Sequence, residues 1–143
     1  MKKRLVNILL AFTLNFVKGH PKKSEIHKIC ESIRNGLGTS EPFSTAVVRL
    51  GFHDCVGGCD GCLNFEDMNN NGLQPITQLL EDIYWQNGFD ALLSHADYWA
   101  MATTIGVQDA MKKALGICQS NCGPLPCIPY YFGRKECSNA PLR

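Results

Sequence analysis

Residues 49–55 read Arg49-Leu50-Gly51-Phe52-His53-Asp54-Cys55, and the rest of the sequence is best understood outward from them. A helix is predicted over residues 42–54 because apolar side chains recur there at helical spacing. Arg49 and His53 are four residues apart, so they project from one face of this helix with Phe52 beside them. On its own, such a pair is more often solvated than functional. The neighbouring residues must decide between the two interpretations.

The whole pattern predicts an all-α fold with long connections. A first helix is expected from Ser24 to Gly36, a third over residues 73–87, and the longest over residues 97–115. The apolar stripe of that longest helix is expected at Ala100, Thr103, Val107, Met111 and Ala114. Residues 118–137 combine three prolines with four cysteines, which is typical of a disulfide-stapled loop.

Three ordered motifs between residues 25 and 137 resemble plant-type haem peroxidases. The stretch around His53 continues into Gly58-Cys59-Asp60-Gly61, as in the distal-side signature of that family. Ala96-Asp97-Tyr98-Trp99-Ala100-Met101-Ala102 is similar to its Ala-Asp-x-x-Ala-x-Ala helix start, and Gly133-Arg134-Lys135-Glu136 to its Gly-Arg-Lys/Arg-Asp stretch. The Gly-Gly-Cys-Asp-Gly-Cys variant is most similar to ascorbate-peroxidase-like proteins of invertebrate animals.

The resemblance implies a role for each distal residue around haem b. His53 would act as the base that takes a proton from hydrogen peroxide and returns it to the leaving oxygen. Arg49 would stabilise the developing negative charge, and Phe52 would pack over the haem edge. Asn70 is the candidate for the family's Asn that holds this His in its productive tautomer. Asn69 and Asn71 compete for that role, and a solvated turn is the alternative for the whole run.

Asp54 and Asp60 match side-chain ligands of the family's distal calcium site. Two departures from the family pattern affect this expectation. The loop between Cys55 and Cys59 is one residue shorter than in plant secretory members, and Cys62 stands where they place a ligating Ser. The resemblance also implies a Cys55–Cys59 disulfide. The spacing of these three cysteines permits an iron–sulfur or zinc site as well, although both require reduced thiolates.

Residues 1–19 are expected to be a secretory signal peptide, with a basic start, a 13-residue apolar run and small residues before His20. Four of the 14 basic residues lie in this segment, which leaves 10 against 13 acidic residues and a net charge of −3. Nucleic acid and membranes are therefore not expected as partners. All eight cysteines follow residue 19, so a secreted, fully oxidised disulfide framework is expected for residues 20–143.

The sequence ends 90 residues after His53, whereas the family's proximal iron ligand lies well over a hundred residues beyond the distal His. Residues 20–143 are accordingly expected to form a distal half-domain with the proximal half absent. Either a second chain completes its exposed haem-facing surface, or the sequence is a truncated product or fragment, or that surface serves another purpose. The expected function is a secreted peroxidase that oxidises a small donor with hydrogen peroxide. The alternatives are a non-catalytic, disulfide-rich structural or matrix protein and a calcium-binding module.

Overall fold

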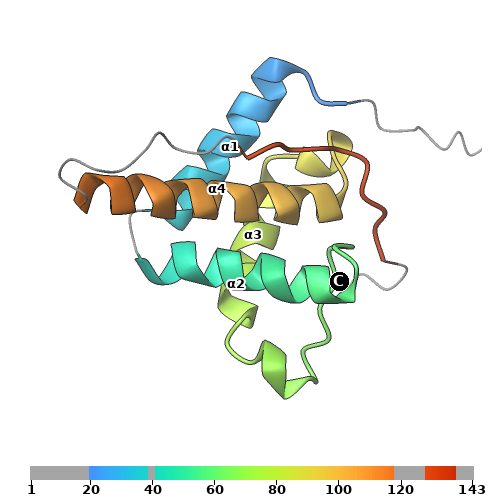
Figure 1. The fold of residues 1–143 in the computed structure, drawn as a ribbon. Coiled ribbons are helices and arrows are strands. Elements are labelled where there is room, and N and C mark those ends of the chain that lie inside the picture. Colours follow the sequence, from blue (N-terminus) through green and yellow to red (C-terminus); the bar gives the residue numbers. More distant parts are fainter. Residues whose placement is uncertain (1–19, 39–40, 118–127, 138–143) are drawn as a thin grey trace, which may run out of the picture.

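Four α-helices and two short 3-10 helices form the protein in a computed structural model that describes residues 20–38, 41–117 and 128–137 (Figure 1). The described residues contain no strand, which confirms the all-α prediction. The elements in chain order are α1 (Lys23–Leu37), α2 (Glu41–Gly57), η1 (Met68–Asn70), α3 (Gln74–Gln86), η2 (Phe89–Ala91) and α4 (His95–Ile117).

Helices α2 and α4 lie side by side and run in opposite directions, with α1 and α3 behind them (Figure 1). Glycines at two crossing points permit this close approach. A Cβ atom on Gly51 would lie 2.1 Å from Oγ1 of Thr103, and one on Gly106 would lie 2.4 Å from Cγ1 of Val47. Both distances are far inside van der Waals contact. The two glycines therefore fix how near α2, which carries Arg49 and His53, sits to α4.

Helix α1 begins at Lys23, one residue before the predicted start at Ser24, and passes through Gly36. The prediction that Gly36 ends this helix is wrong. A Cβ atom at Gly36 would lie 2.2 Å from Cδ1 of Ile83, so this glycine admits α3 against α1. The helix ends instead before Gly38, whose φ of 61° lies in the left-handed region that favours glycine.

The buried side of α4 differs from the stripe predicted for it. Tyr98, Trp99, Ala102 and Ile105 are buried, whereas Ala114 is exposed and the other four predicted positions are half-buried. The prediction assumed one buried face, but α4 contacts both α1 and α2. A helix packed on two sides buries a wider arc than a single stripe at 3.6-residue spacing.

The segment 128–137, called the strap below, runs beside α4 and past its N-terminal end as an extended chain, and it ties the two downstream motifs together (Figure 1). The Asp97 carboxylate accepts the backbone N–H of Gly133 at 2.8 Å and a guanidinium N–H of Arg134 at 3.0 Å. The Asp97 backbone N–H donates to Oγ of Ser94, as expected of a helix cap. The Asp97 carboxylate thus binds Gly133 and Arg134 of the strap rather than completing a capping box with Ser94.

Two disulfides are described, Cys55–Cys59 and Cys62–Cys137, and the first of these confirms the expected pair. Cys62–Cys137 joins the loop after α2 to the end of the strap. The prediction that all eight cysteines are oxidised is wrong for Cys30, which forms no disulfide and lies partly buried. Cys118, Cys122 and Cys127 lie outside the described residues, as does the expected signal peptide at 1–19. Of the helices described, none is both long and apolar enough to cross a bilayer.

Candidate functional site

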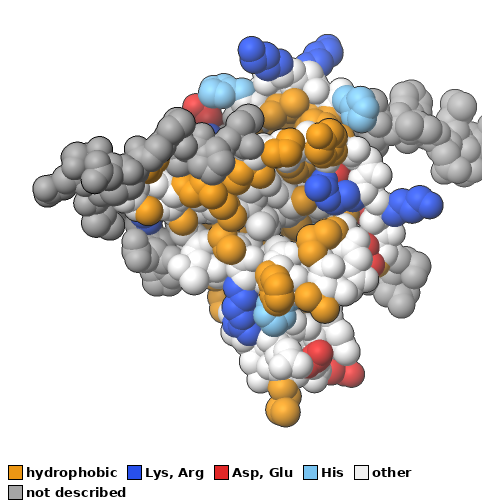
Figure 2. Space-filling view, in the orientation of Figure 1, with side chains coloured by type: hydrophobic (Ala, Val, Ile, Leu, Met, Phe, Trp, Pro, Cys, Tyr) orange, Lys and Arg blue, Asp and Glu red, His pale blue; other side chains and the backbone are white. Residues whose placement is uncertain are grey.

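Helix α2 has one packed face and one open face. Val47 and Leu50 are buried on the packed face. Phe52 is 68% exposed and Arg49 is also exposed, while His53 is half-buried. Hydrophobic, basic and His side chains gather on the face of the molecule formed by α2 and α4 (Figure 2). An exposed Phe beside a basic pair indicates a surface built to meet another group.

The open face of α2 holds His53 against Asn70. Nδ1 of His53 lies 2.8 Å from Oδ1 of Asn70, which is itself buried. The orientation of the Asn70 amide is fixed independently, because its Nδ2 donates to the carbonyl of Asn64 at 2.8 Å. Oδ1 must therefore accept, and Nδ1 of His53 must carry the proton. Within the described residues Nε2 has no hydrogen-bond partner, so its lone pair is available as a base.

The loop that carries Asn70 is held by short-range capping bonds. The Asp67 carboxylate accepts the backbone N–H of Asn69 at 2.9 Å at the start of η1. Oδ1 of Asn64 accepts the backbone N–H of Glu66 at 2.9 Å, which is an Asx turn. These contacts place Asn70, rather than Asn69 or Asn71, next to His53. Sequence reasoning missed Asn64 and Asp67, although Asx residues before a turn are the signal that could have found them.

Arg49 holds the same loop from the other side. Its guanidinium donates to the carbonyl of Asn69 at 2.7 Å and to that of Asn71 at 2.9 Å. These two carbonyls flank Asn70. Arginine has five N–H donors, so the two bonds leave further donors on the open face beside His53. Arg49 can therefore fix the Asn70 loop and still present positive charge next to the base.

The loop after α2 is organised around the buried Asp54. Its Oδ1 accepts the backbone N–H groups of Gly61 at 2.8 Å and Cys62 at 3.3 Å. Burial raises the pKa of the Asp54 carboxyl, the two N–H groups oppose that effect, and the charge of Asp60 adds to it. Asp60 accepts the Cys62 N–H at 3.2 Å. The structure thus gives Asp54 and Asp60 a loop-closing role, and calcium binding by them stays a prediction.

The described residues contain one cluster of metal-ligand type, Asp60 with Cys62 and Cys137. The two cysteines in it are joined in a disulfide and offer no thiolate. Cys55 and Cys59 are likewise paired. All three cysteines of the Cys55-x3-Cys59-x2-Cys62 motif are therefore oxidised, which is incompatible with the iron–sulfur and zinc alternatives.

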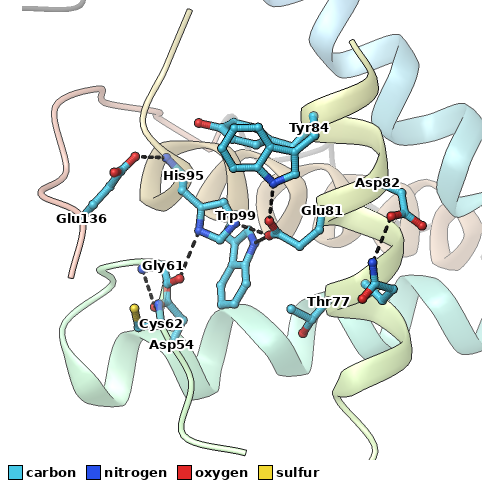
Figure 3. Close-up of polar contacts among 12 residues, drawn as sticks. Asp54, Gly61, Cys62, Thr77, Glu81, Asp82, Tyr84, His95, Trp99 and Glu136 are labelled. Atoms are coloured by element: carbon cyan, nitrogen blue, oxygen red, sulfur yellow. Dashed lines mark hydrogen bonds and ion pairs between the residues drawn. The ribbon is translucent and has the colours of Figure 1, made fainter. Parts of the chain in front are cut away.

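A second polar cluster, drawn in Figure 3, locks this loop to α3 and α4. His95 places Nε2 on a carboxylate oxygen of Glu81 and Nδ1 3.1 Å from the carbonyl of Gly61. With Glu81 as a carboxylate both partners are acceptors, so His95 can donate from both ring nitrogens and form an ion pair with Glu81. The Glu81 carboxylate also accepts the indole N–H groups of Trp85 at 3.0 Å and Trp99 at 3.2 Å. The structural role expected for His95 fits these contacts, whereas Glu81 was not singled out from the sequence.

A match to a family profile assigns this chain to a protein family. The chain matches the family profile described as Peroxidase over residues 26–142. The protein belongs to the peroxidase family. This agrees with the resemblance to plant-type haem peroxidases that the three motifs indicate, whereas the closeness to invertebrate proteins stays a prediction. No curated protein and no solved structure matches the chain.

The donor set of this peroxidase fits one side of a haem group. Its open α2 face offers an apolar ring, a cation and an imidazole whose Nδ1 is bonded to Asn70 and whose Nε2 has no partner among the described residues. The three other histidines are placed differently. His95 uses both nitrogens, His27 pairs with Glu31 on α1, and the His20 ring packs against Phe132. None of these described histidines belongs to the open face of α2.

Proposed function

We propose that this protein is a secreted haem peroxidase that uses hydrogen peroxide to oxidise a small donor, with its distal side formed by Arg49, Phe52, His53 and Asn70. The observation that carries the proposal is the bond between Nδ1 of His53 and Oδ1 of Asn70. When the imidazole is neutral, this bond keeps its proton on Nδ1 and leaves the Nε2 lone pair free, which is the arrangement a general base requires.

The chemistry of the chain's own residues follows from that tautomer. His53 takes a proton from hydrogen peroxide at Nε2 and delivers it to the departing oxygen. Arg49 donates hydrogen bonds to that oxygen as negative charge develops on it. Phe52 packs against the haem edge and limits access to the site. Haem b, when bound, supplies the two electrons that break the O–O bond.

The ligand on the opposite side of the haem is proposed to come from a second polypeptide. This part of the proposal rests on the other described histidines, each of which is engaged away from the open face of α2. The exposed Phe52 supports it, because an apolar ring 68% exposed is suited to being covered.

The test supplies the missing ligand as free imidazole. The purified chain is mixed with haem and imidazole, and peroxide-dependent oxidation of a small phenol is measured. His53→Ala should slow turnover by about 10²–10⁴-fold while haem absorption persists, since the distal base acts in the transition state. Asn70→Val should reduce the rate less, through loss of the tautomer. His27→Ala, which removes an exposed His from α1, is the matched control and should change nothing.

A second candidate function is a non-catalytic, disulfide-rich structural protein. The Cys62–Cys137 disulfide and the Asp97–Arg134 ion pair favour it, because they hold the helices together without a cofactor. If wild type binds no haem in the presence of imidazole, or if turnover is equal in wild type and His53→Ala, the structural candidate replaces the enzyme.

Secretion is proposed from the signal-peptide pattern of residues 1–19. The mature protein recovered from the medium of expressing cells should begin at His20. Its two described disulfides should each lower the mass by two hydrogens relative to the reduced protein. A product that stays in the cell with Met1 intact would contradict this proposal.

A further inference from the structure

A cavity of about 290 Å³ lies between α1, α4 and the strap. Its walls are Ile26 and Cys30 from α1, Met101 and Ile105 from α4, and Tyr130 with Phe132 from the strap. It shares no residue with the open face of α2. Hydrophobic side chains are also visible around α4 and the strap in Figure 2. The cavity is therefore a separate candidate for binding.

The hydroxyl groups in its walls are already bonded within the protein. The Thr104 hydroxyl donates to the carbonyl of Ala100 at 2.9 Å, and the Tyr130 hydroxyl donates to that of Asp97. The Cys30 thiol lies 3.9 Å from the Met101 sulfur. Burial raises the pKa of this thiol, and nearby Arg34 only partly offsets the effect, so the sulfur is neutral. The walls thus offer neither charge nor spare hydroxyl groups to a ligand.

The size of the cavity and the chemistry of its walls indicate which class of molecule can bind in it. An apolar cavity of about 150 Å³ stays dry and binds benzene, and ligand pockets of proteins begin at about 300 Å³. The rings of Tyr130 and Phe132 meet edge to face at 4.9 Å, and two sulfurs lie in the opposite walls. Rings and sulfurs are favourable neighbours for an aromatic molecule.

We propose that this cavity binds a small, uncharged aromatic molecule of about the size of a two-ring heterocycle. The Gln108 carboxamide also lines the cavity. It can form a hydrogen bond with one ring heteroatom of the ligand, because its Oε1 accepts only a 3.5 Å contact from Arg34 among the described residues. A carboxylate on the ligand is disfavoured, because the described lining residues include no cation and the neighbouring Arg34 is paired with Asp109 at 3.7 Å.

Cys30 provides the test, because it is outside any disulfide and lines the cavity. The full chain, without haem, is treated with N-ethylmaleimide, and modification of the Cys30 peptide is followed by mass spectrometry. Millimolar indole should slow the modification several-fold and raise the melting temperature by mass action. Indole-3-carboxylate, which has the same rings and one negative charge, should do neither.

Two variants locate the effect. Thr104→Phe places a ring into the cavity and should abolish the response to indole. Lys112→Phe adds the same ring to an exposed position on α4 and should leave the response intact. The proposal is overturned if indole gives no protection, if the carboxylate protects equally, or if protection persists in Thr104→Phe. The comparison of the two probes on wild type decides the matter even if Thr104→Phe fails to fold.

Discussion

Glu81→Gln should destabilise the protein substantially while preserving the size of the side chain. The carboxylate accepts three N–H groups, from His95, Trp99 and Trp85. A carboxamide has one oxygen and one NH₂ group, so at least one of these donors then faces another donor. Trp85 is 47% exposed and can turn to water, but the His95 side chain is only 16% exposed. The loss therefore falls mainly on the ion pair with His95.

The magnitude follows from that burial. Breaking a buried ion pair by removing one partner costs about 3–5 kcal/mol. The remaining exposure of His95 and the rescue of Trp85 by water reduce the expected loss to about 2–4 kcal/mol. For a chain of this length, such a loss corresponds to a fall of about 10 °C in melting temperature. Urea unfolding followed by far-ultraviolet circular dichroism measures it directly.

The control is Asp82→Asn, the same loss of charge at the next residue of α3. Asp82 is exposed and accepts only a Gln78 side-chain bond at 2.9 Å, so its replacement should cost less than about 0.5 kcal/mol. A double-mutant cycle of Glu81→Gln with His95→Gln should give a coupling energy of about 1–3 kcal/mol. Equal effects of Glu81→Gln and Asp82→Asn, or additive effects of Glu81→Gln and His95→Gln, would rule out a stabilising interaction between Glu81 and His95.

Four further predictions concern the packing and the loop. Gly51→Ala should cost about 1–3 kcal/mol in urea unfolding through its clash with Thr103, and adding Thr103→Ala should restore most of the loss. Asp54→Asn should be more stable than wild type at pH 7 without calcium. Burial raises the folded-state pKa of Asp54, so wild type gains stability as the pH falls toward the pKa of Asp54 in the unfolded chain. The stability advantage of Asp54→Asn over wild type should therefore shrink near pH 4. Calcium should raise the melting temperature of wild type but not of Asp60→Ala, and an unchanged wild-type curve would remove the calcium proposal. Cys62→Ser should lower the free energy of unfolding by about 4 kcal/mol, because the disulfide closes 75 residues, and an unaffected protein would show that the strap is held without it.

The sequence was sufficient to predict those features that depend on local spacing. The helical class and the common face of Arg49 and His53 involve residues within five positions of one another, whereas the Cys55–Cys59 pair was implied by the family resemblance. Asn70 could be chosen only from a family resemblance. Its contact with His53 depends on the fold of the intervening loop, which bonds from Asn64 and Asp67 determine.

Features that depend on distant packing could not be predicted. The pairing of Cys62 with Cys137 is one of many that eight cysteines allow, and spacing does not distinguish among them. The prediction of the buried face of α4 was wrong, because the spacing of apolar residues in the sequence does not show that the helix packs against neighbours on two sides. Glu81 was overlooked because an acidic residue on a helix is normally solvated, and only the tertiary fold brings the Trp99 indole and the His95 imidazole to it.

The hydrogen bonds of the distal face also have a consequence for the order of folding. The contact of His53 with Asn70 spans 17 residues, and those of Arg49 with the same loop span 20 and 22. The contacts that dock the strap on Asp97 span 36 and 37 residues. Short loops close at lower entropic cost and generally form first. We therefore expect the segment 49–71 to acquire its native contacts before the strap docks, so that protection of its amides from hydrogen exchange should precede that of Gly133 during refolding.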